Sequence, residues 1–399
     1  MQKFEKHSPV VVTEVTTKHE LRQFMQYPNR LYADNPNYIP SFYGDDLSDW
    51  TPGKNPAFDY CEARCWLARR DGEIVGRIGA ILSHKANDKF GTHRMRFSQV
   101  DFVDDSEVSA ALFGTVERWA REKGCDQVHG PLGFTDMDRE GMLVEGFDRR
   151  SLFFTNYNAP YYLEHLTRLG YRKDVDWIEY RITVPEPGGA EAERLHKLSE
   201  FILKRKHLHV ATVHHKSEYG PFVRQVFELV NAAYAPLYGV VELSDEQIER
   251  YANKFIPLVD PDFVCFVVDE QDQLVAFGVT ALDPSVALKH SDGRLFPFGW
   301  AGVLNDLHHS DTLIMLLTAV RPDLQTEGIN AVMMDHVCQS CNRHGVHFAE
   351  TGPMLELNDH ILAQWKRLEK EQHKRRRCFI KDLDHDVNAA NAAAAQTET

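Results

Sequence analysis

The predicted elements of this chain occur in the same order twice, and this repetition constrains the fold more than any other feature of the sequence. In the first half, two strand-like runs join at Asp71-Gly72, a strong signal for a two-residue hairpin turn. A strand, a helix, a strand, a helix and a final strand follow. In the second half, the hairpin pattern in "DFVCFVVDEQDQLVAFGVTAL" opens the same series. Strands that alternate with helices in this way predict an α/β fold with a mixed sheet in each half.

The length of the chain also favours two domains, because 399 residues exceed what one hydrophobic core usually serves. Pro, Gly and polar residues gather in "VPEPGGAEAE", a composition typical of a linker. We therefore predict a first domain over 1–186, a linker over 187–193 and a second domain over 194–384. Residues 385–399 end in the low-complexity run "NAANAAAAQTET", which cannot bury a core and is predicted to be a disordered tail.

Charge and hydropathy disfavour several classes of function. The formal charge of -14 argues against sequence-independent binding of nucleic acid, because such binding depends on Lys and Arg side chains that neutralise phosphates. The segment "MQKFEKHSPVVVTEV" lacks the apolar core of a signal peptide, and no apolar run approaches the roughly 20 residues that cross a bilayer. We expect a cytoplasmic protein with neither membrane nor nucleic acid as partner. The basic run from Lys366 to Arg377 holds no aromatic residues for base stacking, so we interpret it as a solvated connector.

The seven cysteines indicate reduced thiols rather than a metal site. Most lie in apolar surroundings, which is typical of core residues. Two pairs, Cys61 with Cys65 and Cys338 with Cys341, are close in sequence. Neither has a second ligand pair at a spacing that suits zinc, so we predict no metal.

One junction of the second half is suited to binding an anion. The apolar run "LIMLLTAV" meets Arg-Pro, then Gln325-Thr326-Glu327-Gly328-Ile329-Asn330, and then a helical pattern. The first amides of a helix have no intrahelical partner and carry partial positive charge. Gly328 lets the backbone approach a phosphate without a Cβ in the way. The amides from Thr326 to Ala331 are therefore predicted to cradle a diphosphate, with a simple turn into the helix as the alternative interpretation.

The matching junction of the first half, "VDFVDDSEVSAAL", has the opposite character. Asp104, Asp105 and Glu107 stand where phosphates would bind, and there is no glycine. Carboxylates at a helix N-terminus satisfy its amides and dipole, and they repel an anion. We predict that the first half keeps the scaffold without the anion site and shapes a substrate cleft or a domain interface.

The order of elements, together with Gln325-x-x-Gly328 between strand and helix, resembles the GCN5-related N-acetyltransferase (GNAT) superfamily. That superfamily carries Arg/Gln-x-x-Gly-x-Gly/Ala at this place and binds the pyrophosphate of acetyl-coenzyme A there; Asn330 departs from the pattern. Segments such as "GRLFPFG" and "YNAPYYLEHLTRLGY" also resemble a bacterial group with paired domains of this kind. The resemblance implies two tandem GNAT-like domains, each a mixed, mostly antiparallel twisted sheet flanked by helices, with the acyl-CoA site in the second.

The resemblance also implies roles for individual residues. Acetyl-CoA or another acyl-CoA would be the co-substrate. Its pyrophosphate would bind the loop, and its pantetheine arm and thioester would meet the strand before it. The implied cofactor-binding residues are Thr318, Ala319, Val320, Gln325, Thr326, Glu327, Gly328, Ile329, Asn330, Ala331 and Asn358. For Asn358, which begins the next helix, plain N-capping is an equal explanation.

Two acids near the end of the strand "VHFAE" are candidates for the base that takes a proton from an amine. These are Glu350 and Glu356, and the alternative for each is a solvated carboxylate at a strand end. The superfamily often uses a tyrosine as acid. No tyrosine follows Tyr251, so none is evident near the loop.

A long Gly-rich loop in the first half, "GPLGFTDMDREGMLVEGFD", is the richest polar segment. Such loops after a strand commonly bind ligands. We predict an acceptor pocket for a cationic or polyhydroxyl ligand, with a structural loop whose acids are salt-bridged as the alternative. Its acceptor-binding residues would be Asp136, Asp138, Arg139 and Glu140, with Tyr157, Tyr161 and Tyr162 as an aromatic wall.

Three functional interpretations remain open from the sequence. The first is an acyl-CoA-dependent N-acyltransferase, in the simplest case an acetyltransferase, for a small-molecule or peptide amine. The second is a tandem scaffold without catalysis that binds a metabolite or protein. The third is an aminoacyl transferase of the Fem type, against which the acidic charge argues. A homodimer is compatible with each.

Overall fold

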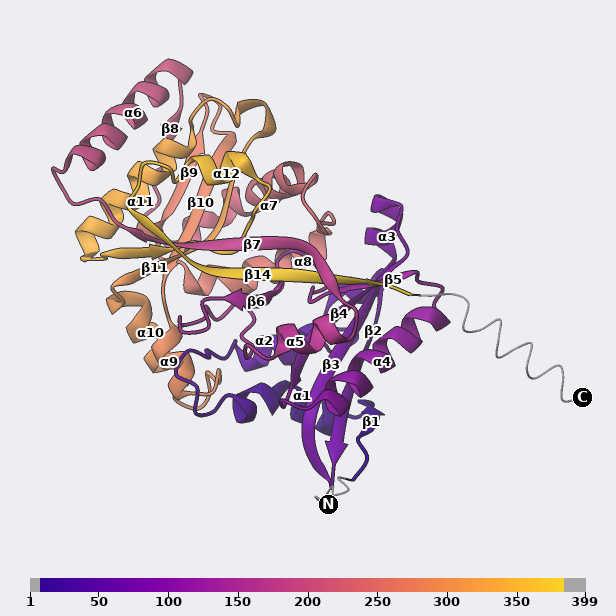
Figure 1. Ribbon diagram of the computed structural model, residues 1–399. Helices are drawn as coiled ribbons and strands as arrows, with labels where there is room; N and C mark the ends of the chain where they lie inside the picture. Colours follow the sequence, from indigo (N-terminus) through magenta and orange to yellow (C-terminus); the bar gives the residue numbers. More distant parts are fainter. Residues whose placement is uncertain (1–7, 384–399) are drawn as a thin grey trace, which may run out of the picture. The chain divides into compact units, whose positions relative to one another are not determined.

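The computed structural model describes residues 8–383, which divide into two compact units. Unit 1 comprises the chain up to Asp176 together with the segment that begins at Arg376, and unit 2 comprises Trp177–Arg375. Strands and helices occur in both (Figure 1). The predicted tail, 385–399, lies outside the described residues.

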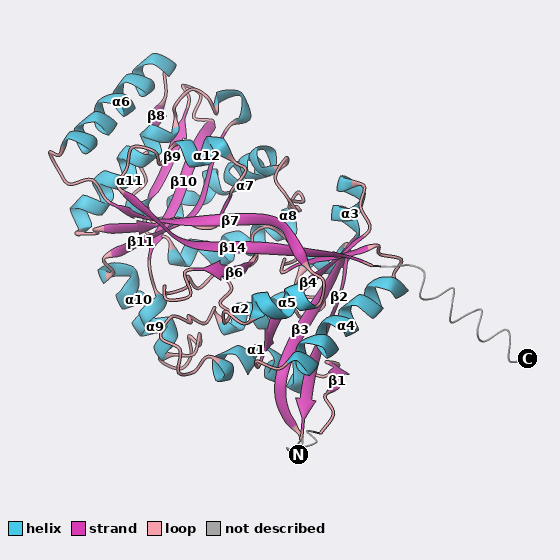
Figure 2. Cartoon of the chain, viewed as in Figure 1, coloured by secondary structure: helices cyan, strands magenta, loops and turns pink. Residues whose placement is uncertain are grey.

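Six strands of unit 1 follow one another in the sheet in the order β1-β2-β3-β4-β5-β14, and the short strand β6 lies off this path. Neighbours are antiparallel, except that β4 and β5 are parallel. Helices flank these strands, with α4 on β3 and β4 (Figure 2). The elements are β1 (Val11–Glu14), α1 (Lys18–Leu31), α2 (Tyr43–Asp49), β2 (Cys61–Arg70), β3 (Glu73–Ser83), α3 (His84–Phe90), β4 (Arg94–Phe102), α4 (Ser106–Glu122), β5 (Gln127–Gly130), β6 (Met142–Glu145), α5 (Tyr162–Arg168) and the start of β7 (Arg172–Thr183).

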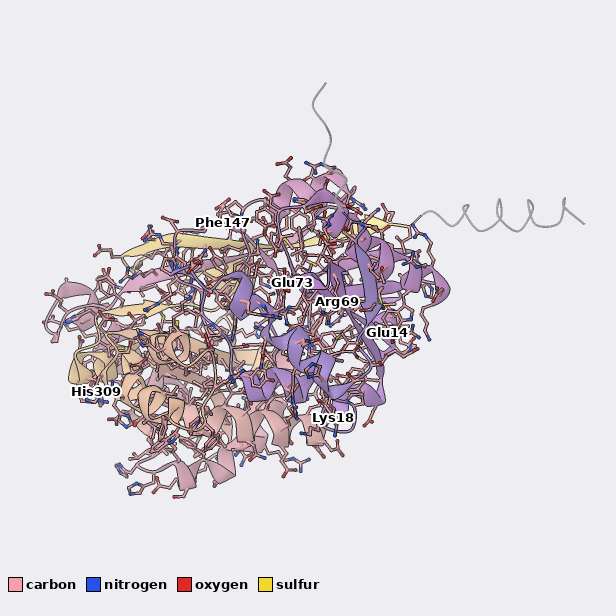
Figure 3. The ribbon with its side chains drawn as sticks, turned by 90° about the horizontal axis from the view of Figure 1, so that it is seen from below. Glu14, Lys18, Arg69, Glu73, Phe147 and His309 are labelled. Atoms are coloured by element: carbon pink, nitrogen blue, oxygen red, sulfur yellow. The ribbon has the colours of Figure 1, made fainter. Side chains whose placement is uncertain are left out.

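Local sequence signals account for much of unit 1. Asp71 and Gly72 both have positive φ, 51° and 84°, as a type I′ hairpin turn requires. Glu14, Arg69 and Glu73 mark the three strands β1, β2 and β3 in Figure 3. The apolar stripe of α4 packs into the core against β3 and β4. Its buried members are Val108, Leu112, Val116 and Trp119.

Unit 2 repeats this sheet, in the order β8-β9-β10-β11-β12-β7. Again one pair, β11 with β12, is parallel and the others are antiparallel. The short strand β13 pairs with β7. The elements are α6 (Ala190–Lys206), β8 (His209–Val210), α7 (Gly220–Tyr234), α8 (Asp245–Phe255), β9 (Val264–Val268), β10 (Leu274–Leu282), α9 (Ser285–His290), α10 (Gly299–His309), β11 (Thr312–Val320), α11 (Asn330–His344), β12 (Phe348–Glu350), β13 (Met354–Leu355), α12 (Asp359–Ala363) and the start of β14 (Lys370–Asp382).

The last strand of each half of the sequence completes the sheet of the other unit. β7 pairs with β12 through 181–183, and β14 pairs with β5 through 379–382. The chain therefore passes from unit 1 to unit 2 within β7, at Asp176, and not within the predicted linker 187–193, part of which already belongs to α6.

The basic run Lys366–Arg377 is not the solvated connector that we predicted. Most of it lies in β14, where Lys374 is 1% and Arg376 0% exposed. Burying these cations requires acidic partners, and Lys374 lies 3.3 Å from the carboxylate of Glu179. This prediction was wrong because the acids that pair with the run are far away in sequence.

Helices α7 and α11 cover opposite faces of the unit 2 sheet. Side chains alternate between the two faces along a strand. In β9, Phe266 stacks on Phe222 of α7, with ring centroids 4.4 Å apart. Its neighbours Cys265 and Val267 lie in the core with residues of α11. Any passage through the sheet therefore connects the α7 face with the α11 face.

Candidate active site

The candidate site begins where two parallel strands of unit 2 separate. β11 pairs with β12 only over 312–314, against 348–350. A bulge at Leu316 interrupts the pairing of β11 with β10 on its other side. Beyond the paired positions, 315–318 and 351–354 both line one cavity. The two strands thus leave a gap in the sheet at the carboxyl end of their paired segment.

This cavity has a volume of about 180 Å³ and belongs entirely to unit 2. It extends from the gap to the face covered by α11 and reaches β7, α6 and α12. Within the described chain, none of the residues that line it is charged. An apolar group would therefore be accommodated there without the cost of burying an unpaired charge.

Tyr234, the last residue of α7, reaches the same gap from the opposite face. Its hydroxyl donates a hydrogen bond to the backbone oxygen of Thr318, over 2.7 Å. The N–H and C=O of one strand residue point to the same side, so the Thr318 amide also faces the gap. The prediction that no tyrosine lies near the loop was wrong, because Tyr234 precedes Tyr251 in the chain and is brought to the gap by the fold. The available signal was the helix pattern that ends at Tyr234, but nothing in it indicates the contact with Thr318.

The loop between β11 and α11 leaves several backbone amides available. In the described part of the chain, no acceptor is found for the amides of Gln325, Thr326, Gly328, Ile329 and Asn330. The Glu327 amide bonds to Leu324 and the Ala331 amide to Gly328. The set of available amides therefore differs from the predicted range 326–331. It lacks Glu327 and Ala331, and it includes Gln325.

The side chains of this loop are arranged around those amides. Gly328 has a φ of 79°, which favours glycine. The ammonium of Lys206 lies 2.6 Å from Glu327 and holds the pKa of that carboxyl below its usual range. Asn330, the first residue of α11, also lines the cavity. The available N–H donors of the loop therefore lie next to the cavity. The nearby acid, Glu327, is neutralised by Lys206.

Glu350 is the last residue of the paired segment of β12. Its neighbour Ala349 belongs to the core under α11, so Glu350 points to the α7 face, the face of Tyr234. Its carboxylate lies 3.2 Å from the ammonium of Lys374 and 3.8 Å from His373. Burial raises the pKa of Glu350. The charge of Lys374 lowers this pKa, and the charges of Asp283 and Glu179 raise it further. A carboxyl with a raised pKa is suited to act as a general base.

The other predicted residues of unit 2 have structural partners. Glu356 forms an ion pair with Arg375 over 3.0 Å. Asn358 caps α12, with its side-chain oxygen accepting from the Ile361 amide. Ala319 and Val320 are each 6% exposed. Their contact with a cofactor, and the role of Glu356 as base, stay predictions.

The acidic loop of unit 1 is tied down by its own contacts. Asp138 accepts hydrogen bonds from the Phe134 and Thr135 amides, at 2.8 and 3.2 Å. Arg139 forms an ion pair with Asp46 over 2.8 Å. Burial raises the pKa of Asp136 to about 6, and burial with the charge of Asp136 raises the pKa of Glu140. These contacts favour the structural alternative, and acceptor binding by this loop stays a prediction.

The three tyrosines of unit 1 contact the interior and do not form an open wall. Tyr162 accepts a hydrogen bond from the Phe102 amide at 2.8 Å and is fully buried. Tyr161 donates to the Phe102 oxygen. Tyr157 accepts from Asn35 over 2.6 Å. Tyr161 and Tyr162 thus complete the end of β4, whereas Tyr157 packs with Tyr32 and Tyr38.

One group of three potential metal ligands occurs among residues 8–383, and it lies in unit 1. His129, Asp174 and Cys378 place their ligand atoms within 4.8 Å of one another. Arg94 lies 3.7 Å from Asp174, and burial with the charges of Arg96 and Arg94 lowers the pKa of His129. Positive charges beside the group disfavour a cation, so we assign no metal to it.

Comparison with known proteins identifies the fold. A tandem GNAT protein of the clavulanic acid biosynthesis pathway aligns with a TM-score of 0.53 at 13% identity, over 94% of this chain and 99% of the other. A GCN5-related N-acetyltransferase from Sphaerobacter thermophilus aligns with a TM-score of 0.51 at 12% identity, over 94% and 96%. The chain therefore has the tandem GNAT fold, which confirms the resemblance and the fold class predicted from the sequence.

Sequence comparison finds more similar relatives. Protein YghO of Escherichia coli strain K12 is 27% identical over 94% of this chain and 95% of its own length. The bacterial ceramide synthase of Caulobacter vibrioides is 28% identical over 73% and 75%. No family model matches the chain. Residues 8–383 contain no helix with the length and apolar character that crossing a bilayer demands.

Proposed function

We propose that unit 2 is an N-acyltransferase, which transfers an acyl group from a coenzyme A thioester to an amine. The observation that carries the proposal is the set of available amides before α11, directly beside a gap in the sheet that opens into an apolar cavity. A diphosphate suits the amides and the positive end of the helix dipole. A thioester arm suits an uncharged slot between separated strands.

The groups around the gap supply what acyl transfer needs. Glu350 accepts a proton from the attacking amine, the Thr318 amide donates to the oxyanion, and Tyr234 protonates the departing sulfur. The C–N bond forms as the C–S bond breaks. The proton taken up by Glu350 returns to solvent, from which Tyr234 is reprotonated. Glu350 and Tyr234 both lie on the α7 face, so the amine approaches from that side.

The Caulobacter relative supports amide formation in particular. A ceramide synthase, as its name states, makes ceramide, and a ceramide is the amide of a fatty acid with a long-chain amino alcohol. The shared region covers 73% of this chain. We therefore take an amine as the acceptor, in agreement with the acceptor class expected from the sequence.

Calorimetry with coenzyme A tests the proposal most directly. Asn330→Asp places a negative charge at the first residue of α11, so coenzyme A is expected to bind the variant about tenfold more weakly, a loss of about 1.4 kcal/mol. Asn330 is half-buried, and its side chain makes no hydrogen bond to the described residues, so the fold should tolerate the change.

The matched control is Ser106→Asp, at the first residue of α4 in unit 1. It adds the same charge at the same position of the other junction, and the affinity for coenzyme A should stay within twofold of wild type. Absence of coenzyme A binding to the wild-type chain would refute the proposal and favour the scaffold without catalysis. Equal effects of both variants would place the cofactor elsewhere.

A further inference from the structure

We propose that the cavity beneath the gap holds the acyl chain of the donor, and that this chain has about six carbon atoms or more. The inference rests on the proposed function, since it takes the thioester to lie in the gap between β11 and β12. It goes beyond that function by naming the class of acyl group, which the sequence analysis took to be acetyl in the simplest case.

The wall of the cavity along α11 starts at the cradle and runs away from it. Residues Asn330, Met333, Met334, Val337, Cys338 and Cys341 all line the cavity. Their spacings of three and four form one stripe on the helix. From 330 to 341 this stripe is about 16 Å long at 1.5 Å per residue, several times the reach of an acetyl group. An elongated chain attached at the gap is the shape that follows such a stripe.

The remaining walls are also largely apolar, although they include the uncharged polar residues Tyr234, Thr280, Thr318, Thr351 and Gln364. Ile182 and Val184 of β7 and its extension, Leu195 of α6 and Trp365 beyond α12 all face the cavity. The indole N–H of Trp365 points to the sulfur of Met354, 3.2 Å away, which keeps that donor occupied. Hydrocarbon is the ligand chemistry that this lining favours, because it needs no hydrogen-bond partners.

The volume sets a lower limit on the size of the ligand. An apolar cavity of about 150 Å³ in another protein takes up benzene, and this one measures about 180 Å³. It therefore has room for an apolar group of roughly six carbon atoms, and an acetyl group would leave most of it empty. Met315, Met333 and Met334 are among the lining residues, and the flexible side chain of methionine adapts to longer chains.

Two cysteines, Cys338 and Cys341, lie at the far end of the stripe. Their size therefore limits the length of the acyl chain that the cavity can hold. Cys338 is 7% and Cys341 1% exposed. Burial raises their pKa, to about 11 for Cys338 and to about 12 for Cys341, so both are neutral thiols at physiological pH. A thiol is a small apolar side chain. Larger residues at these two positions would shorten the space available to the acyl chain.

Binding of acyl-CoA donors to the full chain, without any acceptor, tests the inference. Each buried methylene favours binding by roughly fourfold, so octanoyl-CoA should bind the wild type at least tenfold more tightly than acetyl-CoA. Cys338→Phe fills the far end, and this preference should fall below threefold. Cys338→Leu, a smaller change, should give an intermediate preference if the Phe variant does not fold.

Gln339→Phe is the matched control, because it adds the same ring on the exposed side of the same helix turn. It should keep the wild-type preference for octanoyl-CoA. If the wild type binds coenzyme A but does not distinguish octanoyl-CoA from acetyl-CoA, the inference is wrong while the proposed function stands. If only the chain length of the amine acceptor matters, the cavity holds the acceptor and the inference is also wrong. Failure to bind any of these ligands overturns both.

Discussion

In unit 1 the amides that open α4 are bonded by the chain itself, whereas in unit 2 the amides before α11 are available to a ligand. The Asp105 carboxylate accepts hydrogen bonds from the Glu107 and Val108 amides. Arg70 forms ion pairs with the carboxylates of Asp105 and Glu107, at 2.5 and 2.7 Å. Both junctions connect the fourth strand in the strand order of its unit to a helix. The same scaffold therefore leaves these amides open or bonds them within the chain, according to whether a glycine or acids stand at the turn.

The gaps beside the two junctions differ in the same way. In each unit the parallel pair is only three residues long, 94–96 against 127–129 and 312–314 against 348–350. In unit 1 the chain fills the space beyond, since the Leu132 amide bonds to the Phe97 oxygen and Arg96 bonds to the Gly133 oxygen. In unit 2 the corresponding space is a cavity. The gap therefore stays open in unit 2, where no backbone or side-chain contact of this kind fills it among the described residues, and is closed in unit 1.

Replacing Glu350 should have the largest effect, because its carboxylate is the proposed base. The equivalent position of unit 1 holds the buried His129. We expect Glu350→Gln to lower the rate of amide formation at least a hundredfold, with little change in coenzyme A affinity. Release of the free thiol measures the rate. His129→Gln should leave the rate unchanged, and a normal rate in Glu350→Gln would exclude this residue as the base.

The same residue predicts a pH dependence. A general base works when deprotonated, so the raised pKa of Glu350 should place the acidic limb of kcat/KM above the usual range of a glutamate. Lys374 opposes that rise. Lys374→Met should therefore shift the limb to still higher pH, as recorded in a kcat/KM profile. A shift to lower pH would contradict the assignment.

Removing the hydroxyl of Tyr234 should have a smaller effect. Tyr234→Phe deletes the hydrogen bond to Thr318 and the proposed acid, and we expect thioester turnover to fall roughly tenfold to a hundredfold. A thioester with a more acidic thiol needs less help in leaving and should recover most of the loss. Tyr162→Phe in unit 1, which loses the bond from the Phe102 amide, should affect stability alone. Equal rates with both thioesters would show that Tyr234 acts only on the backbone of β11.

The smallest effect should come from opening the junction of unit 1. Asp105→Ala removes a helix N-cap, which costs about 1 kcal/mol in the free energy of unfolding. Arg70 lowers the pKa of Asp105, so this stability is fully present above the usual Asp pKa and is lost as the pH falls through the lowered value. Urea unfolding at pH 7 and pH 3 measures both points. Gain of a second coenzyme A site in this variant would show that the acids alone close unit 1.

Signals within a few residues predicted their structures well. The hairpin turn at Asp71-Gly72, the cap at Asp105 and the glycine at Gly328 each depend on local backbone geometry, and all three have the expected conformation. The helix predicted directly after the loop is α11, which occupies Asn330–His344 and ends at Gly345 in a left-handed conformation. Helices α6, α9 and α10 were not anticipated, because their segments were not recognised as periodic.

Contacts between distant segments were not predictable. Tyr234 meets Thr318 across 84 positions of sequence, and Lys374 meets Glu179 across the whole of unit 2. No pattern within either segment indicates its partner. For the same reason the basic run Lys366–Arg377 was predicted to be solvated, although most of it lies in β14, with Lys374 and Arg376 buried.

The sequence by itself determined the repeated order of elements and the chemical contrast between the two junctions, because turns, caps and helix starts depend on neighbouring residues. Only the tertiary structure decided that β7 and β14 each complete the sheet of the other half, that β11 and β12 separate over a cavity, and that Tyr234 and Glu350 lie on the same face. Strand pairing and packing join residues that the chain keeps far apart, and the sum of many such contacts selects the arrangement.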